Sequence, residues 1–267
     1  RNSGHVRLSP DAKWVSVGYV GQLTWVWAVA SATPVLKIPV RIAWHSVDFS
    51  PDSKTLAAAS RGGTLTLYDL ATGVLVQRVS CMQKPIIARF GPGGKTVAVG
   101  GGRTVEFIDL ASRRVVQVLQ QSENVLHLAW HPNGRQLATG SDSSIHLWNT
   151  AEGKLTSTLR TRSVTDRVAF NRTGDLLASA GWDQMLRLWD PRTGELLVSR
   201  ESGGMNLQFN PDGTRLAAGA SGSRLTVWEV VRSRACQRVG VARATDIGFV
   251  GLVLAVLPYN DARFSLS

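Results

Sequence analysis

The fold of this chain is decided by residues 47–79, which read VDFSPDSKTLAAASRGGTLTLYDLATGVLVQRV. An apolar–x–aromatic segment runs into a Ser-Pro-Asp turn, and a β-rich run follows at residues 56–59. After a glycine-containing loop, apolar and polar residues alternate over residues 65–68, and a fourth short run ends at Val79. Such alternation between Gly, Pro and Asp turns predicts short antiparallel strands. The stretch therefore predicts four strands in about forty residues.

Two landmarks of this stretch recur along the chain. The turn after the first strand recurs at steps of 41, 41, 40, 40 and 39 residues, entered from Leu8, Phe49, Phe90, Trp130, Phe170 and Phe209. The end of the third strand recurs at steps of 41, 40, 40, 41 and 39 residues, at Trp27-Ala28, Tyr68-Asp69, Ile108-Asp109, Trp148-Asn149, Trp189-Asp190 and Trp228-Glu229. Four short strands per period of about forty residues are typical of a β-propeller blade. We therefore predict an all-β propeller.

The third-strand dipeptides and the turns together resemble those of the WD-repeat family. The dipeptides at residues 148–149, 189–190 and 228–229 carry the resemblance, and Ser-Pro-Asp recurs at residues 9–11 and 50–52. The resemblance covers residues 5–245. It implies a rigid platform of loops that binds peptides or protein domains.

The family pins each blade with a hydrogen-bonded group of His, Asp, Ser or Thr, and Trp. Two blades match three of the four members: the fourth blade has Thr139, Asp142 and Trp148, and the fifth has Ser179, Asp183 and Trp189. In neither blade does the preceding loop supply the His. The first, second, third and sixth blades lack the Asp as well. The resemblance implies structural roles for Asp142 and Asp183, and places Trp148, Trp189 and Trp228 in the core.

The spacing predicts a single propeller domain over residues 1–267 with seven blades of four antiparallel strands, the last incomplete. The blades are expected at residues 5–40, 46–82, 86–122, 126–162, 166–201 and 205–241, with a partial seventh at 246–267. In that seventh blade, residues 252–257 would form the second strand. Its missing outer strand would come from sequence outside the chain or from a partner by strand addition. Six blades plus a tail is the alternative.

Composition bounds the class of protein. The chain has 267 residues, 43% of them hydrophobic, and only two cysteines, Cys81 and Cys236, which cannot form a disulfide framework. It contains no apolar run of the about 18 residues that a membrane span needs, and no signal peptide, so we expect a cytoplasmic protein. Because it starts at Arg1, we expect a piece of a longer protein. Its wealth of arginine, alanine and glycine favours a bacterial source.

The net charge of +11 suggests an anionic partner such as nucleic acid. However, positive and negative residues nearly balance on each of the two loop faces, and the excess arginine lies on the strands at the rim. A nucleic-acid-binding protein concentrates its charge on one face or stripe. We therefore regard nucleic acid as an unlikely partner.

Catalytic and metal-binding signatures are weak. Residues 91–96, Gly-Pro-Gly-Gly-Lys-Thr, end like a phosphate-binding loop, but the first Gly of that motif is replaced by Arg89, and the segment lies between strands. His127 and His131 have a helical metal-ligand spacing, yet on a strand entering a turn they face different ways. We therefore expect no enzyme activity, no metal and no cofactor.

Three charged residues occupy an unusual position before the innermost aromatic residue, where a small residue is the rule. They are Arg7, Asp48 and Arg89 in the first three blades, whereas the fourth and fifth blades carry alanine there. Equivalent positions of neighbouring blades lie side by side near the axis, and unpaired buried charges are costly. We therefore predict an Arg7–Asp48–Arg89 ion network; the alternative is that all three point into a wet channel.

A protein partner is expected on the face formed by the loops between second and third strands and between successive blades. The candidate contact residues there are Arg41, Trp44, His45, Arg61, Arg103, Arg162, Trp182 and Arg224. Trp182 is the best of them, because the family usually has a small or polar residue at that position and because Trp and Arg dominate interface hot spots.

The leading hypothesis is a non-catalytic scaffold or sensor propeller within a larger bacterial signalling, defence or assembly complex. The alternatives are an exported propeller resembling the YVTN type, a basic propeller associated with nucleic acid, and an enzyme housed in a propeller channel. The last would need clustered histidines or carboxylates near the axis, where only Asp48 is found.

Overall fold

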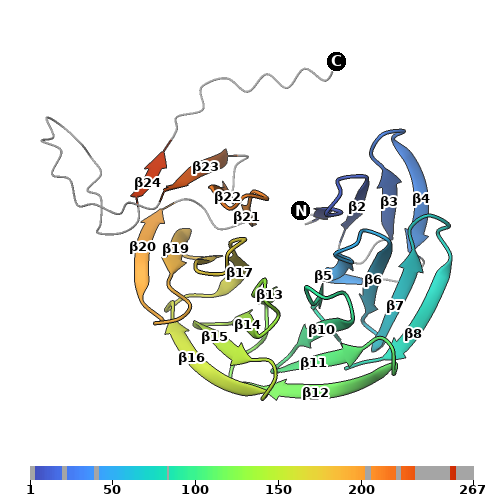
Figure 1. The fold of residues 1–267 in the computed structure, drawn as a ribbon, viewed down its shortest axis with the longest axis horizontal. Coiled ribbons are helices and arrows are strands. Elements are labelled where there is room, and N and C mark those ends of the chain that lie inside the picture. Colours follow the sequence, from blue (N-terminus) through green and yellow to red (C-terminus); the bar gives the residue numbers. More distant parts are fainter. Residues whose placement is uncertain are drawn as a thin grey trace, which may run out of the picture. The chain divides into compact units, whose positions relative to one another are not determined.

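A computed structural model of the chain describes residues 4–19, 23–38, 42–82, 84–201, 206–220, 224–231 and 253–256. Every regular element among these residues is a β-strand (Figure 1). The strands form four-stranded antiparallel meanders, in which each strand pairs with the next along the chain. The predicted all-β propeller of four-stranded antiparallel blades is therefore confirmed.

The strands follow the forty-residue period. Blade one contains β1 (Gly4–Leu8), β2 (Trp14–Tyr19), β3 (Thr24–Ala28) and β4 (Thr33–Ile38), and blade two contains β5 (Ile42–Phe49), β6 (Thr55–Ser60), β7 (Thr64–Asp69) and β8 (Leu75–Ser80). Blade three contains β9 (Ile87–Phe90), β10 (Thr96–Gly101), β11 (Thr104–Asp109) and β12 (Arg114–Gln120), and blade four contains β13 (His127–Trp130), β14 (Gln136–Gly140), β15 (Ser144–Asn149) and β16 (Lys154–Arg160). Blade five contains β17 (Thr165–Phe170), β18 (Leu177–Gly181), β19 (Met185–Trp189) and β20 (Leu196–Glu201), and blade six contains β21 (Asn206–Phe209), β22 (Arg215–Ala220), β23 (Arg224–Val231) and β24 (Val253–Val256).

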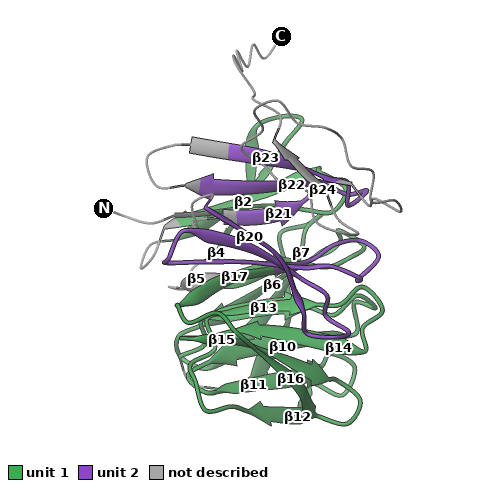
Figure 2. Cartoon of the chain, turned by 90° about the vertical axis from the view of Figure 1, so that its left-hand side faces the viewer, with its two compact units in different colours: residues 1–168 green, residues 169–267 purple. Residues whose placement is uncertain are grey.

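The chain divides into two compact units, Arg1–Val168 and Ala169–Ser267, with the boundary inside β17 (Figure 2). In the first unit, the first strand of each blade lies innermost and the fourth outermost (Figure 1). A parallel bridge between His45 and Ile87 joins β5 to β9, so that blades two and three form one eight-stranded sheet.

The hydrophobic core of the first unit lies between neighbouring blades. On β6, Leu56 and Ala58 pack toward blade one, whereas Ala57 and Ala59 pack toward blade three. All four side chains are buried, because successive residues of a strand point to opposite faces of the sheet and here both faces are covered. This two-sided burial explains why the second strands read as continuous apolar runs.

In the second unit, a comparable cluster joins blades five and six. Leu186 and Leu188 of β19 pack with Leu216 of β22 and with Trp228 of β23. Trp148, Trp189 and Trp228 are all buried.

The Ser-Pro-Asp turns are held by their own side chains. In blade two, Ser50 Oγ donates to Asp52 Oδ1 at 2.6 Å, and the backbone N–H of Lys54 donates to the same oxygen at 3.1 Å. The Thr55 N–H in turn donates to Ser50 Oγ at 2.9 Å. These hydrogen bonds lower the pKa of Asp52. The recurrence of Asp at this position is therefore explained by turn formation.

The turn position that follows Asp11 and Asp52 is left-handed in each of the six described turns, and it is glycine in the other four blades. Ala12 and Ser53 hold the same position with φ of 59° and 58°. Because a Cβ disfavours this region, we expect Ala12→Gly to stabilise the first unit by about 0.5–1 kcal/mol. Urea unfolding measures this change. The reverse exchange, Gly94→Ala at φ 70°, is the control and is expected to destabilise; a loss of stability in Ala12→Gly would contradict the strain.

Among the residues that the structure describes, the strands form six blades and not seven, so the prediction of seven blades is wrong. Val253–Val256 forms β24, which pairs antiparallel with β23 from Trp228↔Val256 to Val231↔Val253. These residues are thus the outer strand of blade six and not the second strand of a seventh blade. A short apolar run fits either place in a blade, so its sequence alone cannot distinguish them. The rest of residues 246–267 lies outside the described ranges, and the strand donor for a seventh blade is not retained.

Candidate functional site

Three predicted contact residues of the first unit lie on exposed loops. Arg61 and Arg103 occupy the turns that follow β6 and β10, and Arg162 lies between β16 and β17 with a positive φ of 61°. Their side chains are all exposed. Since β6 and β10 are the second strands of neighbouring blades, Arg61 and Arg103 lie in corresponding turns, one residue apart in alignment.

The other predicted contact residues of blades two and six are only partly described. Arg41 lies outside the described residues, as do the side chains of Trp44, His45 and Arg224. The backbones of Trp44 and His45 belong to β5, and Arg224 begins β23.

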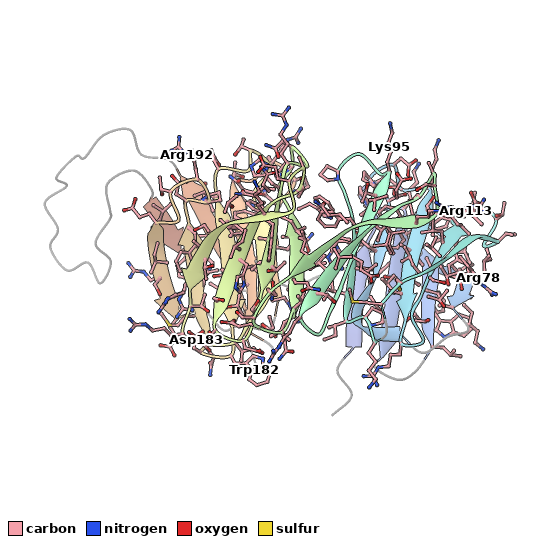
Figure 3. The ribbon with its side chains drawn as sticks, turned by 90° about the horizontal axis from the view of Figure 1, so that it is seen from below. Arg78, Lys95, Arg113, Trp182, Asp183 and Arg192 are labelled. Atoms are coloured by element: carbon pink, nitrogen blue, oxygen red, sulfur yellow. The ribbon has the colours of Figure 1, made fainter. Side chains whose placement is uncertain are left out.

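Trp182 is the most exposed large apolar side chain in the described part of the chain, at 73%. It lies on the turn between β18 and β19, beside Asp183 (Figure 3). This turn is held from within: Arg187 Nη2 donates to Asp183 Oδ2 at 2.6 Å, and the Met185 N–H donates to Asp183 Oδ1 at 3.1 Å. An exposed indole therefore projects from a turn whose backbone is fixed by an ion pair.

Two of the buried tryptophans donate to hydroxyl groups of the second strands of their own blades. Trp189 Nε1 donates to Ser179 Oγ at 2.9 Å, and Trp148 Nε1 donates to Thr139 Oγ1 at 3.2 Å. Asp142 accepts from the backbone and side-chain amides of Asn124, at 3.1 and 2.8 Å.

Sequence reasoning missed Gln121, which extends the hydrogen-bonded chain of blade four. Thr139 Oγ1 donates to Gln121 Oε1 at 2.7 Å, and Gln121 Nε2 donates to Ser141 Oγ at 2.7 Å. Gln121 lies in the loop before the blade, where a His was sought. An amide carries both a donor and an acceptor, as neutral imidazole does. A search for that chemistry would have found Gln121.

The three charged residues near the first strands are brought close to one another. Arg7 Nε lies 2.7 Å from Asp48 Oδ1, and the Phe90 N–H donates to Asp48 Oδ2 at 2.8 Å. Asp48 and Arg89 are each only 6% exposed. Arg89 Nη1 donates to the Ala88 carbonyl at 2.8 Å, and Arg89 Nη2 lies 3.2 Å from His127 Nε2. Burial lowers the pKa of Arg89, with Arg7 adding to this effect and Asp48 opposing it.

Sequence reasoning also missed two neighbouring charged residues, Asp166 and Arg167, on β17, the first strand of blade five. Arg167 Nη1 lies 3.3 Å from Asp166 Oδ2, and burial lowers the pKa of this arginine. His127 was considered as a metal ligand, and its ring instead meets Arg89. Among the residues that the structure describes, no three His, Cys, Asp or Glu side chains gather closely enough to hold a metal ion.

The one cysteine whose side chain is described, Cys81, packs against the core between blades two and three. Burial, followed by the charge of Glu106, raises the pKa of the Cys81 thiol to about 12. Such a thiol stays protonated at neutral pH and is a poor nucleophile. Within the described ranges, no apolar helix has the length needed to cross a bilayer.

Comparison with known proteins identifies the repeats. Residues 42–69, 113–149 and 153–190 match the family described as WD domain, G-beta repeat. Each matched segment ends at a third-strand dipeptide, Tyr68-Asp69, Trp148-Asn149 or Trp189-Asp190. Together with the blades, these matches confirm the predicted resemblance.

Several curated proteins are similar to short parts of the chain. A segment of 66 residues is 36% identical to THO complex subunit 3 of Arabidopsis thaliana and covers 24% of this chain and 21% of that protein. A match of 66 residues is 39% identical to the periodic tryptophan protein 2 homolog of Mus musculus and covers 23% of this chain and 7% of that protein. The homolog of Schizosaccharomyces pombe is 35% identical over 66 residues, which cover 24% of this chain and 8% of that protein. The matched part thus spans about a fifth or less of each relative.

Proposed function

We propose that this β-propeller, three segments of which match the WD-repeat family, is a non-catalytic scaffold that binds protein or peptide partners through the turns after its second strands. The observation that carries this proposal is Trp182, an indole 73% exposed on a turn braced by the Asp183–Arg187 ion pair. A rigid aromatic side chain loses little entropy on binding, and Trp and Arg are the residues most enriched at interface hot spots.

The comparisons support a role within an assembly. One similar protein is by its name a subunit of a complex, and WD-repeat propellers generally act as scaffolds. The exposed Arg61, Arg103 and Arg162 belong to the first unit, and we propose them as candidate contact residues of that unit alone. We propose that the chain is part of a larger signalling, defence or assembly complex in the cytoplasm. Its composition, rich in arginine and alanine, supports a bacterial source for the protein.

Replacing Trp182 is the direct test. We expect Trp182→Ala to weaken partner binding about tenfold or more, because an interface tryptophan buries a large apolar area. The measurement is affinity capture from the native source followed by titration of each captured protein against purified wild type and variant.

The matched control is Trp25→Ala. Trp25 is also an exposed tryptophan, but it lies on β3 with Lys37 Nζ 5.0 Å from its ring centroid. The proposal would be contradicted if the captured partners bound Trp182→Ala as tightly as wild type. It would also be contradicted if Trp25→Ala weakened their binding as much as Trp182→Ala does.

A further inference from the structure

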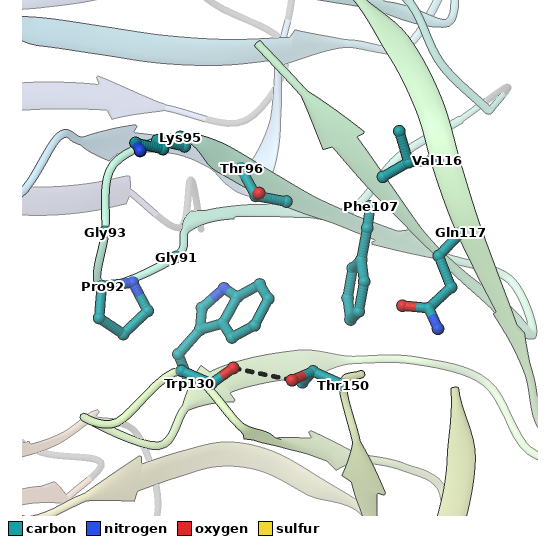
Figure 4. A pocket seen from close by; sticks show the side chains of 11 residues that line it. Gly91, Pro92, Gly93, Lys95, Thr96, Phe107, Val116, Gln117, Trp130 and Thr150 are labelled. Atoms are coloured by element: carbon teal, nitrogen blue, oxygen red, sulfur yellow. Dashed lines mark hydrogen bonds between the residues drawn. The ribbon is translucent and has the colours of Figure 1, made fainter. Parts of the chain in front are cut away.

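A hollow of about 290 Å³ opens between blades three and four, within the first unit (Figure 4). Its floor is aromatic: the rings of Phe107 and Trp130 lie 5.1 Å apart with an interplanar angle of 33°. Trp130 Nε1 donates to the Arg89 carbonyl at 3.3 Å, which fixes the indole. The hollow thus has an aromatic floor of fixed orientation, bordered by the polar side chains of Thr96, Gln117 and Thr150.

One wall of the hollow is the glycine-rich turn that resembled a phosphate-binding loop. Gly91 and Gly93 line it and carry no side chain, and a Cβ at Gly93 would meet no atom within 4 Å. Lys95 stands at the end of the same turn. On the outer side, Val116 of β12 lines the hollow and is 60% exposed, so apolar surface continues from the floor to the rim.

The size of the hollow limits its occupant. Pockets for drug-sized ligands span about 300–1,000 Å³, and this one is at or below the lower end. It therefore fits one large apolar side chain.

The turns around the hollow are basic. Lys95, Arg113, Arg114 and Arg135 are all exposed there. The pairs Thr96↔Asp109 and Asp109↔Arg114 place the first three at the same end of blade three, and Lys95 and Arg113 are labelled in Figure 3. The Thr150 N–H donates to the Arg135 carbonyl at 3.1 Å, which places Arg135 beside the lining residue Thr150.

The acidic residues of these turns already have partners. Asp109 accepts from the N–H and the hydroxyl of Ser112, both at 2.7 Å. Glu152 lies 3.4 Å from Lys154 Nζ. The four exposed cations outnumber these two carboxylates, which leaves a positive rim around the hollow.

We propose that this hollow, which we call the blade 3–4 groove, binds an acidic segment of a partner protein that inserts one aromatic or leucine side chain onto Phe107 and Trp130. Acidic residues on either side of that anchor pair with the basic rim. The groove lies at the Lys95 end of β10, whereas Arg103 follows the other end of the same strand. It is therefore a second site, independent of the surface proposed above.

The test uses the full chain and a fluorescein-labelled peptide of about twelve residues, with one Phe between runs of Asp and Glu. By anisotropy we expect a dissociation constant on the order of 10 µM. Replacing the Phe of the peptide by Ser is expected to weaken binding about tenfold. Binding that does not depend on the Phe would overturn the apolar anchor.

Protein variants separate the groove from general charge attraction. Gly93→Glu places a carboxylate on the open wall, and we expect about tenfold weaker binding from like-charge repulsion. Lys95→Glu with Arg113→Glu is expected to weaken binding at least as much. The control pair, Arg78→Glu with Arg160→Glu, makes the same change in net charge at exposed residues of β8 and β16 that do not line the hollow, and it is expected to leave the Kd within about twofold.

Three results would overturn the proposal: no binding of the peptide at millimolar protein, equal loss with both charge-reversal pairs, or displacement of the peptide by an equal concentration of a single-stranded oligonucleotide. Circular dichroism and thermal unfolding show that each variant is folded. Because the proposed Trp182 surface is untouched by the groove variants, loss of one activity leaves the other measurable.

Discussion

Asp48→Ala is expected to lower the free energy of unfolding by about 3 kcal/mol, the largest effect of any single exchange we propose. Two buried groups lose their partner together. The Phe90 N–H loses the acceptor that lies 2.8 Å away, and the buried charge of Arg89 loses the carboxylate that opposes its like-charged neighbours. Arg7 contributes less, because its side chain is 37% exposed and can turn to water.

Urea unfolding followed by tryptophan fluorescence measures this loss. Glu152→Ala is the control, since it removes an exposed carboxylate paired with Lys154, and we expect a change below about 0.5 kcal/mol. An unchanged midpoint in Asp48→Ala would show that the three charges are hydrated and independent.

A double-mutant cycle identifies the partner. In an Arg89→Met background the buried positive charge is gone, and Asp48→Ala should then cost less than it does in the wild type. The remainder is the hydrogen bond to Phe90. Equal costs in both backgrounds would show that Asp48 and Arg89 do not interact.

The blades could be predicted from sequence because each carries two landmarks tied to local chemistry. The Asp of the first turn, present in blades one, two and six, hydrogen-bonds to a side-chain hydroxyl and to the backbone. The aromatic residue at the end of the third strand fills the core between blades. Both signals lie within a few residues of the structure they specify, so the period survives even where the dipeptide is degenerate, as at Ile108-Asp109.

The outer strand of blade six could not be predicted because its place depends on a distant pairing. In blades two to five, the fourth strand follows the third after a short turn, whereas β24 follows β23 after residues 232–252. Hairpin loops usually have about 2–5 residues. The forty-residue period therefore predicts that an apolar run as far along the chain as residues 253–256 belongs to the next blade. Only the register between Trp228 and Val256 resolves the ambiguity.

The candidate sites were predictable to different degrees. Charges at the Arg7, Asp48 and Arg89 positions stand out because small residues are expected there, and the structure brings Arg7 and Asp48 into contact. The blade 3–4 groove was not foreseen. The groove depends on the contact between Phe107 of blade three and Trp130 of blade four. The spacing of residues within a single repeat does not predict a contact between two repeats.

Gln121→Leu is expected to cost about 2 kcal/mol, because it breaks the hydrogen-bonded chain of blade four at its centre. The Thr139 hydroxyl loses the acceptor that lies 2.7 Å away, and the Ser141 hydroxyl loses a donor at the same distance. Thr139 and Ser141 are both buried, so water does not replace the missing partner. Leucine is close to glutamine in volume, and the cost therefore reports on polar groups and not on a cavity.

Gln121→His is the matched control for this chain. Neutral imidazole offers one acceptor for Thr139 and one donor for Ser141, as the glutamine amide does, so we expect it to retain most of the stability that leucine loses. Thermal and urea unfolding compare the three proteins. If Gln121→His is as unstable as Gln121→Leu, the site requires the shape of the glutamine side chain. If both variants are as stable as the wild type, the hydrogen bonds of Gln121 do not contribute to the stability of blade four.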